Sequence, residues 1–167
     1  MPAVGGWQYS CLAHDPPYAW TVTAQPSLPA REGIASELGL YEDLPRYLLA
    51  GEPWVEYGVI EYRFGRARPD DYRDLIARWG HVSQGDRGTR HGTGGRYSVS
   101  AFLARTLAQL GEDGTIAVTF GPATGFWSYN GVILHVSKPP GPGDDRRLSW
   151  TAFADGAGLD PMVWPLA

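Results

Sequence analysis

The chain has 167 residues, 43% of them hydrophobic, and seven tryptophans, which is enough apolar material for the core of one ordinary domain and excludes wholesale disorder. No apolar run approaches the ~20 residues that a helix needs to cross a bilayer, and the first residues lack the basic and apolar regions of a signal peptide. The one cysteine, Cys11, has no second cysteine for an internal disulfide. We therefore expect a cytoplasmic protein that does not associate with membranes.

Charge is spread unevenly along the chain, whose formal net charge is −4. Residues 1–62 carry −6, residues 63–105 carry +5, and residues 106–167 carry −3. The positive stretch is suited to attract phosphate. Thirteen arginines against one lysine are also typical of a high-GC bacterial genome, in which such a stretch is an ordinary solvated surface. Both interpretations stay open.

The first 52 residues are predicted to form a loop-rich extension with short elements. Alternating apolar residues favour a strand at 18–23, and weaker patterns favour helices at 31–38 and 43–50. Residues 54–64 have the composition of a strand and the spacing of a helix, so both assignments stay open.

Two later segments give clear helical signals. Residues 69–79 begin with a proline and two aspartates and are followed by Gly80, which suits the start and the stop of a helix. Residues 98–113 have Ser98 in the position of an N-cap. The apolar positions in these helices and the strand after them define the predicted core, which is Tyr72, Leu75, Ile76, Trp79, Phe102, Leu103, Leu107, Leu110, Ile116 and Val118.

A hairpin is predicted to follow the second helix. Residues 115–120 alternate, with Ile116, Val118 and Phe120 on one face, and residues 132–137 return as a strand. Between them lie a turn at 121–125 and an aromatic tip at 126–131. The tip is either the end of a wing or, because Asn-Gly favours a type I′ turn, part of a three-stranded meander.

The segment from Val99 to Ile116 resembles the recognition helix of many bacterial regulators, in which L-x-x-L-x-x-x-G leads into the first wing strand. Leu107, Leu110 and Gly114 form this pattern here. With the helix and hairpin on either side, the region is similar to helices two and three and the wing of the winged helix-turn-helix superfamily. The resemblance implies an α+β fold made of an N-terminal mixed extension at 1–52, a winged-helix-like domain at 53–140, and a linker with a C-terminal packing segment at 141–167.

The same resemblance implies a DNA-binding protein that regulates transcription and contacts double-stranded DNA. The glycine-rich stretch 85–96 leads into a helix N-terminus, where backbone N–H groups favour an anion, although a mobile surface loop is the simpler alternative. Serines at the start of the helix are placed to reach bases, and aromatic residues at the tip are placed to stack on them. The predicted nucleic-acid-binding residues are Arg87, Arg90, Arg96, Ser98, Ser100, Arg105, Trp127 and Tyr129.

The outer face of the 98–113 helix offers an alternative. Ala101, Ala104 and Ala108 lie on one side of it, and small side chains permit close packing against another helix. This pattern predicts a homodimer, or a protein–protein interaction module on the same scaffold with the aromatic tip as part of the surface. Both possibilities remain alternatives to DNA binding.

A small enzyme is the third possibility, and no catalytic motif supports it. His81 and His91 lie ten residues apart in a glycine-rich stretch, which does not suit a pre-oriented metal site. Paired carboxylates occur only as neighbours in sequence, where they rarely face one another across a substrate. We predict no catalytic residue, no cofactor and no metal.

Overall fold

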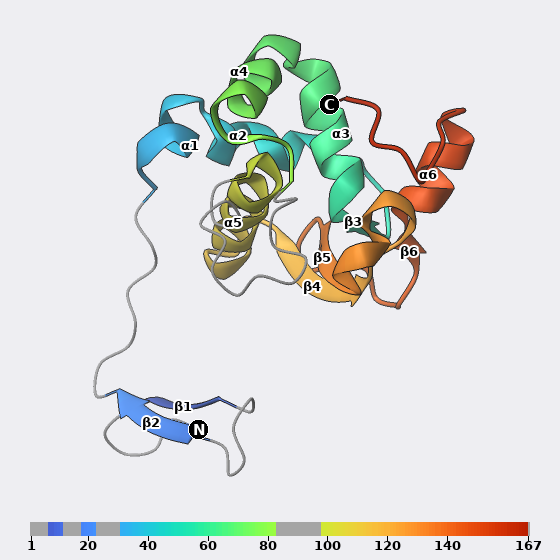
Figure 1. Cartoon of the computed structure of the whole chain (residues 1–167). Helices are drawn as coiled ribbons and strands as arrows, with labels where there is room; N and C mark the ends of the chain where they lie inside the picture. The colour runs from blue at the N-terminus through green and yellow to red at the C-terminus, as the bar shows by residue number, and fades with distance from the viewer. Residues whose placement is uncertain (1–6, 12–17, 23–30, 83–97, 167) are drawn as a thin grey trace. The chain divides into compact units, whose positions relative to one another are not determined.

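The computed structural model describes residues 7–11, 18–22, 31–82 and 98–166, and the chain divides into two compact units, residues 1–30 and 31–167 (Figure 1). In the first unit, β1 (Trp7–Cys11) pairs with β2 (Tyr18–Val22) in an antiparallel ladder that runs from Trp7↔Val22 to Cys11↔Tyr18. The strand predicted at 18–23 is confirmed, and β1 is an element that the sequence pattern did not reveal.

The second unit is a mixed α+β fold with several helices and one four-stranded sheet. No helix of the described ranges is long and apolar enough to cross a membrane. In chain order the elements are α1 (Gly33–Glu37), α2 (Leu40–Asp43), the 3₁₀ helix η1 (Leu44–Tyr47), β3 (Trp54–Glu56), α3 (Tyr57–Ala67), α4 (Pro69–Trp79), α5 (Val99–Glu112), β4 (Ala117–Pro122), the 3₁₀ helix η3 (Gly125–Asn130), β5 (Val132–Ser137), β6 (Arg147–Leu148) and α6 (Trp150–Gly156).

The helices predicted at 69–79 and 98–113 are both confirmed, and so are the residues that begin and end them. The helix α4 begins at Pro69 with two aspartates in its first turn and ends before Gly80, whose φ of 75° suits glycine. Ser98 caps α5, because its Oγ accepts a hydrogen bond of 3.1 Å from the Ala101 N–H. The segment 54–64, for which both assignments were left open, contains both structures: a three-residue strand that continues directly into α3.

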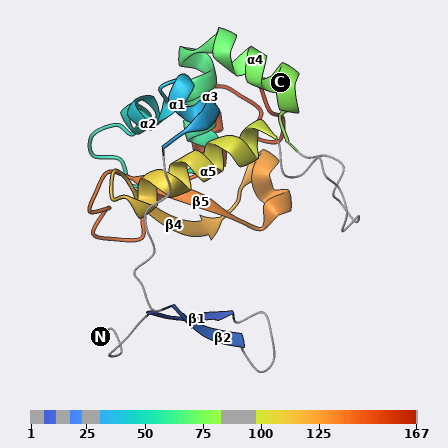
Figure 2. The same cartoon turned by 90° about the vertical axis from the view of Figure 1, so that its left-hand side faces the viewer.

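The sheet has the strand order β4-β5-β3-β6, with antiparallel pairs except between β3 and β6, which are parallel. Val55 and Val136 are paired and buried on one face, and the next pair, Glu56 and His135, is buried on the other. The helix α5 lies over β4 and β5 (Figure 2). One face of the sheet is therefore apolar, and the opposite face carries buried polar groups.

Of the two alternatives for the hairpin tip, the type I′ turn at Asn130 and Gly131 is wrong. Residues 125–130 form η3, and Asn130 has a negative φ, so a two-residue type I′ turn, which needs positive φ at both positions, does not form here. The alternation of the first strand is also interrupted. Ile116 is buried and Val118 is packed at the edge of the core, but Phe120 on the same pattern is 66% exposed.

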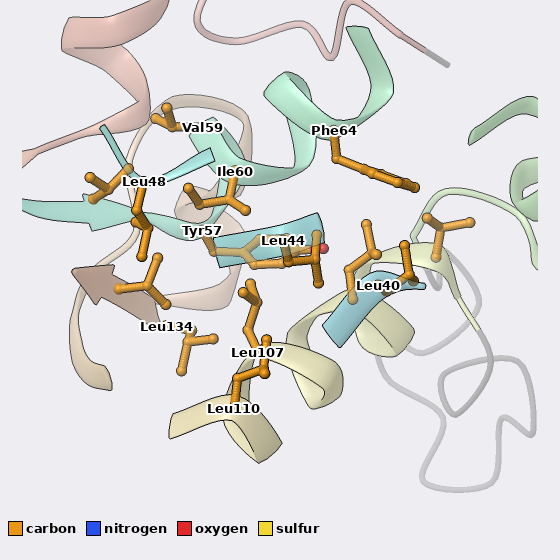
Figure 3. Packing of buried hydrophobic residues seen from close by; sticks show 14 of the residues in the cluster. Leu40, Leu44, Leu48, Tyr57, Val59, Ile60, Phe64, Leu107, Leu110 and Leu134 are labelled. Atoms are coloured by element: carbon orange, nitrogen blue, oxygen red, sulfur yellow. The ribbon is translucent and has the colours of Figure 1, made fainter. Parts of the chain in front are cut away.

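The core combines residues from along the whole second unit (Figure 3). Of the predicted core, six residues are buried, namely Tyr72, Leu75, Leu103, Leu107, Leu110 and Ile116, and the other four pack against it. Leu40 and Leu44 from the short N-terminal helices and Trp150 and Trp164 from the C-terminal segment are buried as well. Segments before residue 53 and after residue 140 therefore contribute to the same hydrophobic core as the region 53–140.

Candidate functional site

The predicted nucleic-acid-binding residues fall into two groups in the structure. Arg87, Arg90 and Arg96 lie outside the described residues. The other five line a single cavity of about 470 Å³ between α5 and the β4–β5 hairpin, and they are Ser98, Ser100, Arg105, Trp127 and Tyr129. This space is called the α5–hairpin cavity below.

The walls of the cavity are largely apolar. Ala101, Ala104 and Ala108 of α5 form one side, and residues of the hairpin, including Phe120 and Val132, form the other. Three large apolar side chains of the hairpin also reach solvent here, with exposed fractions of 66% for Phe120, 61% for Val132 and 42% for Tyr129. The residues that were predicted to read DNA therefore surround an apolar hollow.

The size of side chains on α5 explains why the cavity forms. At the end of the helix Gly111 lies against Val118, and a Cβ atom added to this glycine would stand only 2.4 Å from the valine Cγ2 atom. The helix thus touches the sheet closely at that end. Nearer its start, the alanines that face the hairpin are too short to fill the space between the helix and the strands.

Each of the five residues has a defined environment. Ser98 is 3% exposed and caps its helix, and Ser100 bonds inward, as described below, so neither hydroxyl is directed to solvent as a base-reading group. The Trp127 ring is buried, and it packs edge-on against Tyr57 with centroids 5.3 Å apart. Arg105 and Tyr129 are the two that lie at the surface.

A buried carboxyl group lies beneath the cavity, and the sequence predictions did not include it. Glu61 of α3 is fully buried and accepts hydrogen bonds from the hydroxyls of Tyr57 (2.7 Å), Tyr72 (2.7 Å) and Ser100 (3.1 Å). His81 Nε2 lies 2.8 Å from Glu61 Oε1, although its ring N–H is not aligned for a hydrogen bond. Tyr57 and Ser100 also line the cavity, so this cluster, the Glu61 cluster, supports the cavity wall.

Aromatic rings enclose the cluster. The His81 ring stacks on Trp164 with centroids 4.7 Å apart and on Phe126 with centroids 5.6 Å apart. Trp164 in turn donates its indole N–H to the Tyr72 hydroxyl at 3.0 Å. Burial, together with the negative charge of the neighbouring Glu61, raises the pKa values of Tyr57 and Tyr72 well above the usual tyrosine value, so both hydroxyls stay protonated donors.

The geometry of the Glu61 cluster does not match a nucleophile and base. In a serine–histidine–acid triad the imidazole lies between the hydroxyl and the acid. Here the carboxyl group itself contacts Ser100 on one oxygen and His81 on the other. Within the described ranges there is also no group of three side chains that is able to hold a metal ion. The sequence signal that marks Glu61 is a lone acid inside an apolar helical stripe, which predicts a buried and hydrogen-bonded carboxyl group.

A second buried carboxyl group lies on the other face of the sheet. Glu56 Oε2 accepts hydrogen bonds from the Thr124 hydroxyl and from the Trp150 backbone N–H, both at 3.1 Å. Its other oxygen, Oε1, is buried and has no hydrogen-bond partner among the residues that the structure describes. Burial raises the pKa of Glu56 to about 7, against the opposing effect of these two donors. Glu56 thus links the inner strand β3 to the starts of η3 and α6.

Several arginines of the positive stretch are paired with acids. Arg63 bonds Glu52 through two nitrogens, at 2.6 and 2.9 Å, and Arg68 contacts Asp71 at 2.7 Å and Asp43 at 3.3 Å. Arg73 contacts Asp70 at 3.1 Å. Asp70 and Asp71 are already included in the net charge of +5 along 63–105, whereas Glu52 and Asp43 lie outside that stretch and balance a further part of its charge in the fold.

Comparisons of the chain with protein-family models, with curated proteins and with solved structures found no match. The functional argument therefore depends on the geometry of the α5–hairpin cavity and the groups around it.

Proposed function

We propose that this chain is a non-catalytic protein-interaction module in which the α5–hairpin cavity receives apolar side chains of a partner. The observation that carries the proposal is the gathering of exposed Phe120, Tyr129 and Val132 around a hollow lined by alanines. Single exposed apolar residues are ordinary on a protein surface, but several large ones around an apolar hollow are typical of a protein–protein contact. Aromatic residues at such a contact commonly contribute much of the binding energy.

The wall is also held in place, which lowers the entropic cost of binding. Ser98 caps the start of α5, and the hydroxyl of Ser100, the second residue of the helix, is held between the buried Glu61 and the His81 backbone carbonyl. On the hairpin side, Trp127 fits closely over Gly58, where an added Cβ atom would come within 2.1 Å of the indole nitrogen. A preformed surface of this kind does not need to be ordered when the partner arrives.

A substitution in the cavity wall tests this proposal. We expect Ala104→Glu to weaken the binding of a natural partner at least tenfold, because it places a charge in the apolar wall. The partner is first isolated with the unmodified protein as bait, identified by mass spectrometry and purified, and its affinity is then measured by titration calorimetry. Ala152→Glu, on the exposed side of α6, is the matched control and should bind normally. Equal affinities for all three proteins would refute a role for the cavity.

DNA binding by a winged-helix domain is the second candidate, and a specific feature favours it. The chain order of α4, α5 and an antiparallel hairpin supports this candidate, because a winged helix has two helices and a wing in that order along the chain. Arg105 lies at the surface of α5, which begins directly after the segment that contains Arg87, Arg90 and Arg96. On this proposal the chain is a transcription regulator, and these arginines contact phosphates.

The salt dependence of binding tests the second candidate. Each phosphate contact releases counterions, so the logarithm of affinity should fall with the logarithm of salt concentration by roughly 0.9 per contact. We expect the joint change of Arg96 and Arg105 to alanine to flatten this slope by about one to two units. Fluorescence anisotropy with random and genomic duplexes is the measurement. Arg146→Ala, which removes an exposed arginine paired with Asp144, is the control. No binding at low salt would exclude this function.

A further inference from the structure

We propose that Glu56 is a proton-controlled latch: in its protonated form it holds the start of η3 to the sheet, and its ionisation loosens η3 and with it one side of the α5–hairpin cavity. The latch belongs to the fold and is testable without any partner. Its consequence for regulation, that a partner binds less tightly as the pH rises, rests on the proposed interaction function.

One carboxyl oxygen of Glu56 joins three elements. Glu56 Oε2 accepts hydrogen bonds from the hydroxyl of Thr124, the N-cap residue of η3, and from the backbone N–H of Trp150, the first residue of α6, both at 3.1 Å. The Thr124 hydroxyl in turn accepts a hydrogen bond of 3.1 Å from the Thr151 N–H. The starts of η3 and α6 are therefore bonded to β3 and to one another at this point.

The surroundings of the carboxyl group favour its neutral form. Glu56 is fully buried, and its second oxygen, Oε1, has no hydrogen-bond partner among the described residues. Both groups that donate to Oε2 are neutral. An ionised Glu56 would be a buried charge with an unsatisfied oxygen, which is costly in an apolar interior. Burial accordingly raises the pKa of Glu56 to about 7.

The charged groups around Glu56 do not compensate it. On its face of the sheet they are His135 of β5, with which it is paired, and Arg147 of β6. The Arg147 guanidinium lies against Gly121 of β4, and its buried Nη1 has no hydrogen-bond partner in the described part of the chain, so no bond joins it to Glu56. The 3₁₀ helix η3 has no charged residue, and the one in α6, Asp155, is exposed. Ionisation is therefore relieved by water, which requires the contact to open.

The 3₁₀ helix η3 connects the latch to the cavity. It carries Trp127, Tyr129 and Asn130, which line the cavity. The Trp127 ring also packs against Tyr57, the residue that follows Glu56, with centroids 5.3 Å apart. A displacement at the start of η3 therefore moves side chains that form the hairpin side of the cavity.

Hydrogen exchange at the Trp150 amide measures the latch directly, because this N–H is bonded to Glu56. In an opening that hydrates the carboxyl group, the pKa of Glu56 returns from about 7 to its ordinary value of 4.5. The opening equilibrium should then rise about seventyfold between pH 5 and pH 8. We expect the protection factor of this amide in the full-length protein, corrected for intrinsic exchange and measured by NMR, to fall by that ratio.

Two comparisons make the exchange experiment specific. Leu107 is buried in the middle of α5, and its amide should stay better protected than that of Trp150 at every pH. Glu56→Gln keeps an acceptor but does not titrate, so it should remove the pH dependence at Trp150, whereas Glu37→Gln, at an exposed carboxyl group, should retain it. Equal protection of the two amides, or an equal fall in Glu56→Gln, overturns the latch. If Glu56→Gln does not fold, the two amides of the unmodified protein still decide.

A fluorine label tests the link to the cavity. The protein is labelled with 5-fluorotryptophan, and the Trp127 resonance is assigned with Trp127→Phe. We expect this resonance to shift with the same midpoint as the Trp150 exchange, and to stay fixed in Glu56→Gln. A response at Trp150 without one at Trp127 overturns control of the cavity. Neither measurement involves a partner, so the affinity of a purified partner for Ala104→Glu decides the interaction function separately.

Discussion

Replacing Glu61 with alanine should lower the free energy of unfolding by roughly 3–5 kcal/mol. The carboxyl group is fully buried and is the acceptor for the hydroxyls of Tyr57, Tyr72 and Ser100. Alanine leaves the Tyr72 hydroxyl without its acceptor, leaves Tyr57 and Ser100 only the backbone carbonyl groups of Ser100 and His81, and opens a cavity where the side chain lay. Urea denaturation followed by tryptophan fluorescence measures the change.

Two comparisons make the Glu61 experiment specific. Glu61→Gln keeps the shape and one acceptor oxygen, so it should cost clearly less than alanine, although its amide group faces a hydroxyl donor. Glu37→Ala, at the exposed end of α1, removes an equal carboxyl group from the surface and should change stability by no more than about 0.5 kcal/mol. If Glu61→Ala and Glu37→Ala unfold at the same midpoint, the buried cluster does not stabilise the fold.

The Glu61 cluster also connects stability with the proposed binding surface. Tyr57 and Ser100 contact Glu61 and line the cavity, so a loosened cluster should loosen the cavity wall. Loss of binding in a Glu61 variant alone would therefore not identify a contact residue. The alanines and Phe120, which have no hydrogen-bonding role in the cluster, are the positions that separate binding from folding.

Local signals along the chain were sufficient to predict the helices α4 and α5 and the returning strand β5. A proline and two aspartates at the start of α4, and a serine cap with a regular apolar stripe in α5, are effects that act within a few residues. The strand β5 was also predicted from residues that are close together in the sequence. The short strand β3 was not resolved from α3, because it exists through its pairing with β5 and β6, which lie far away in the sequence.

Sequence reasoning predicted only part of the cavity lining, and it predicted those residues as DNA contacts. Ser98, Ser100, Arg105, Trp127 and Tyr129 converge on the cavity because each lies at the start of α5, within it or on the hairpin beside it. Their environment depends on contacts that periodicity does not encode. The pairing of Ser100 with Glu61 joins positions 39 residues apart, and Trp127 is buried because Gly58 of α3 leaves room for it. Such contacts are set by tertiary packing.

Glu56 should make the protein less stable as the pH rises from about 4.5 to about 7. Its pKa in the folded state is about 7, raised from 4.5 by burial. In this window the folded chain keeps a proton that the unfolded chain has released, so the free energy of unfolding falls with rising pH. A shift of this size corresponds to a loss of roughly 2–3 kcal/mol across the window. Denaturation midpoints measured through the window test this.

Glu56→Gln isolates the effect, because glutamine keeps an acceptor for Thr124 and the Trp150 N–H but does not titrate. The neighbouring His135 contributes a slope of the opposite sign: burial lowers its pKa, so the unfolded chain binds its proton more readily and stability rises toward pH 6.5. That contribution is present in both proteins. The difference in stability between Glu56→Gln and the unmodified chain should therefore grow in favour of the variant as the pH rises. Parallel pH profiles would show that Glu56 titrates as an ordinary carboxyl group, and that its buried Oε1 is solvated in solution.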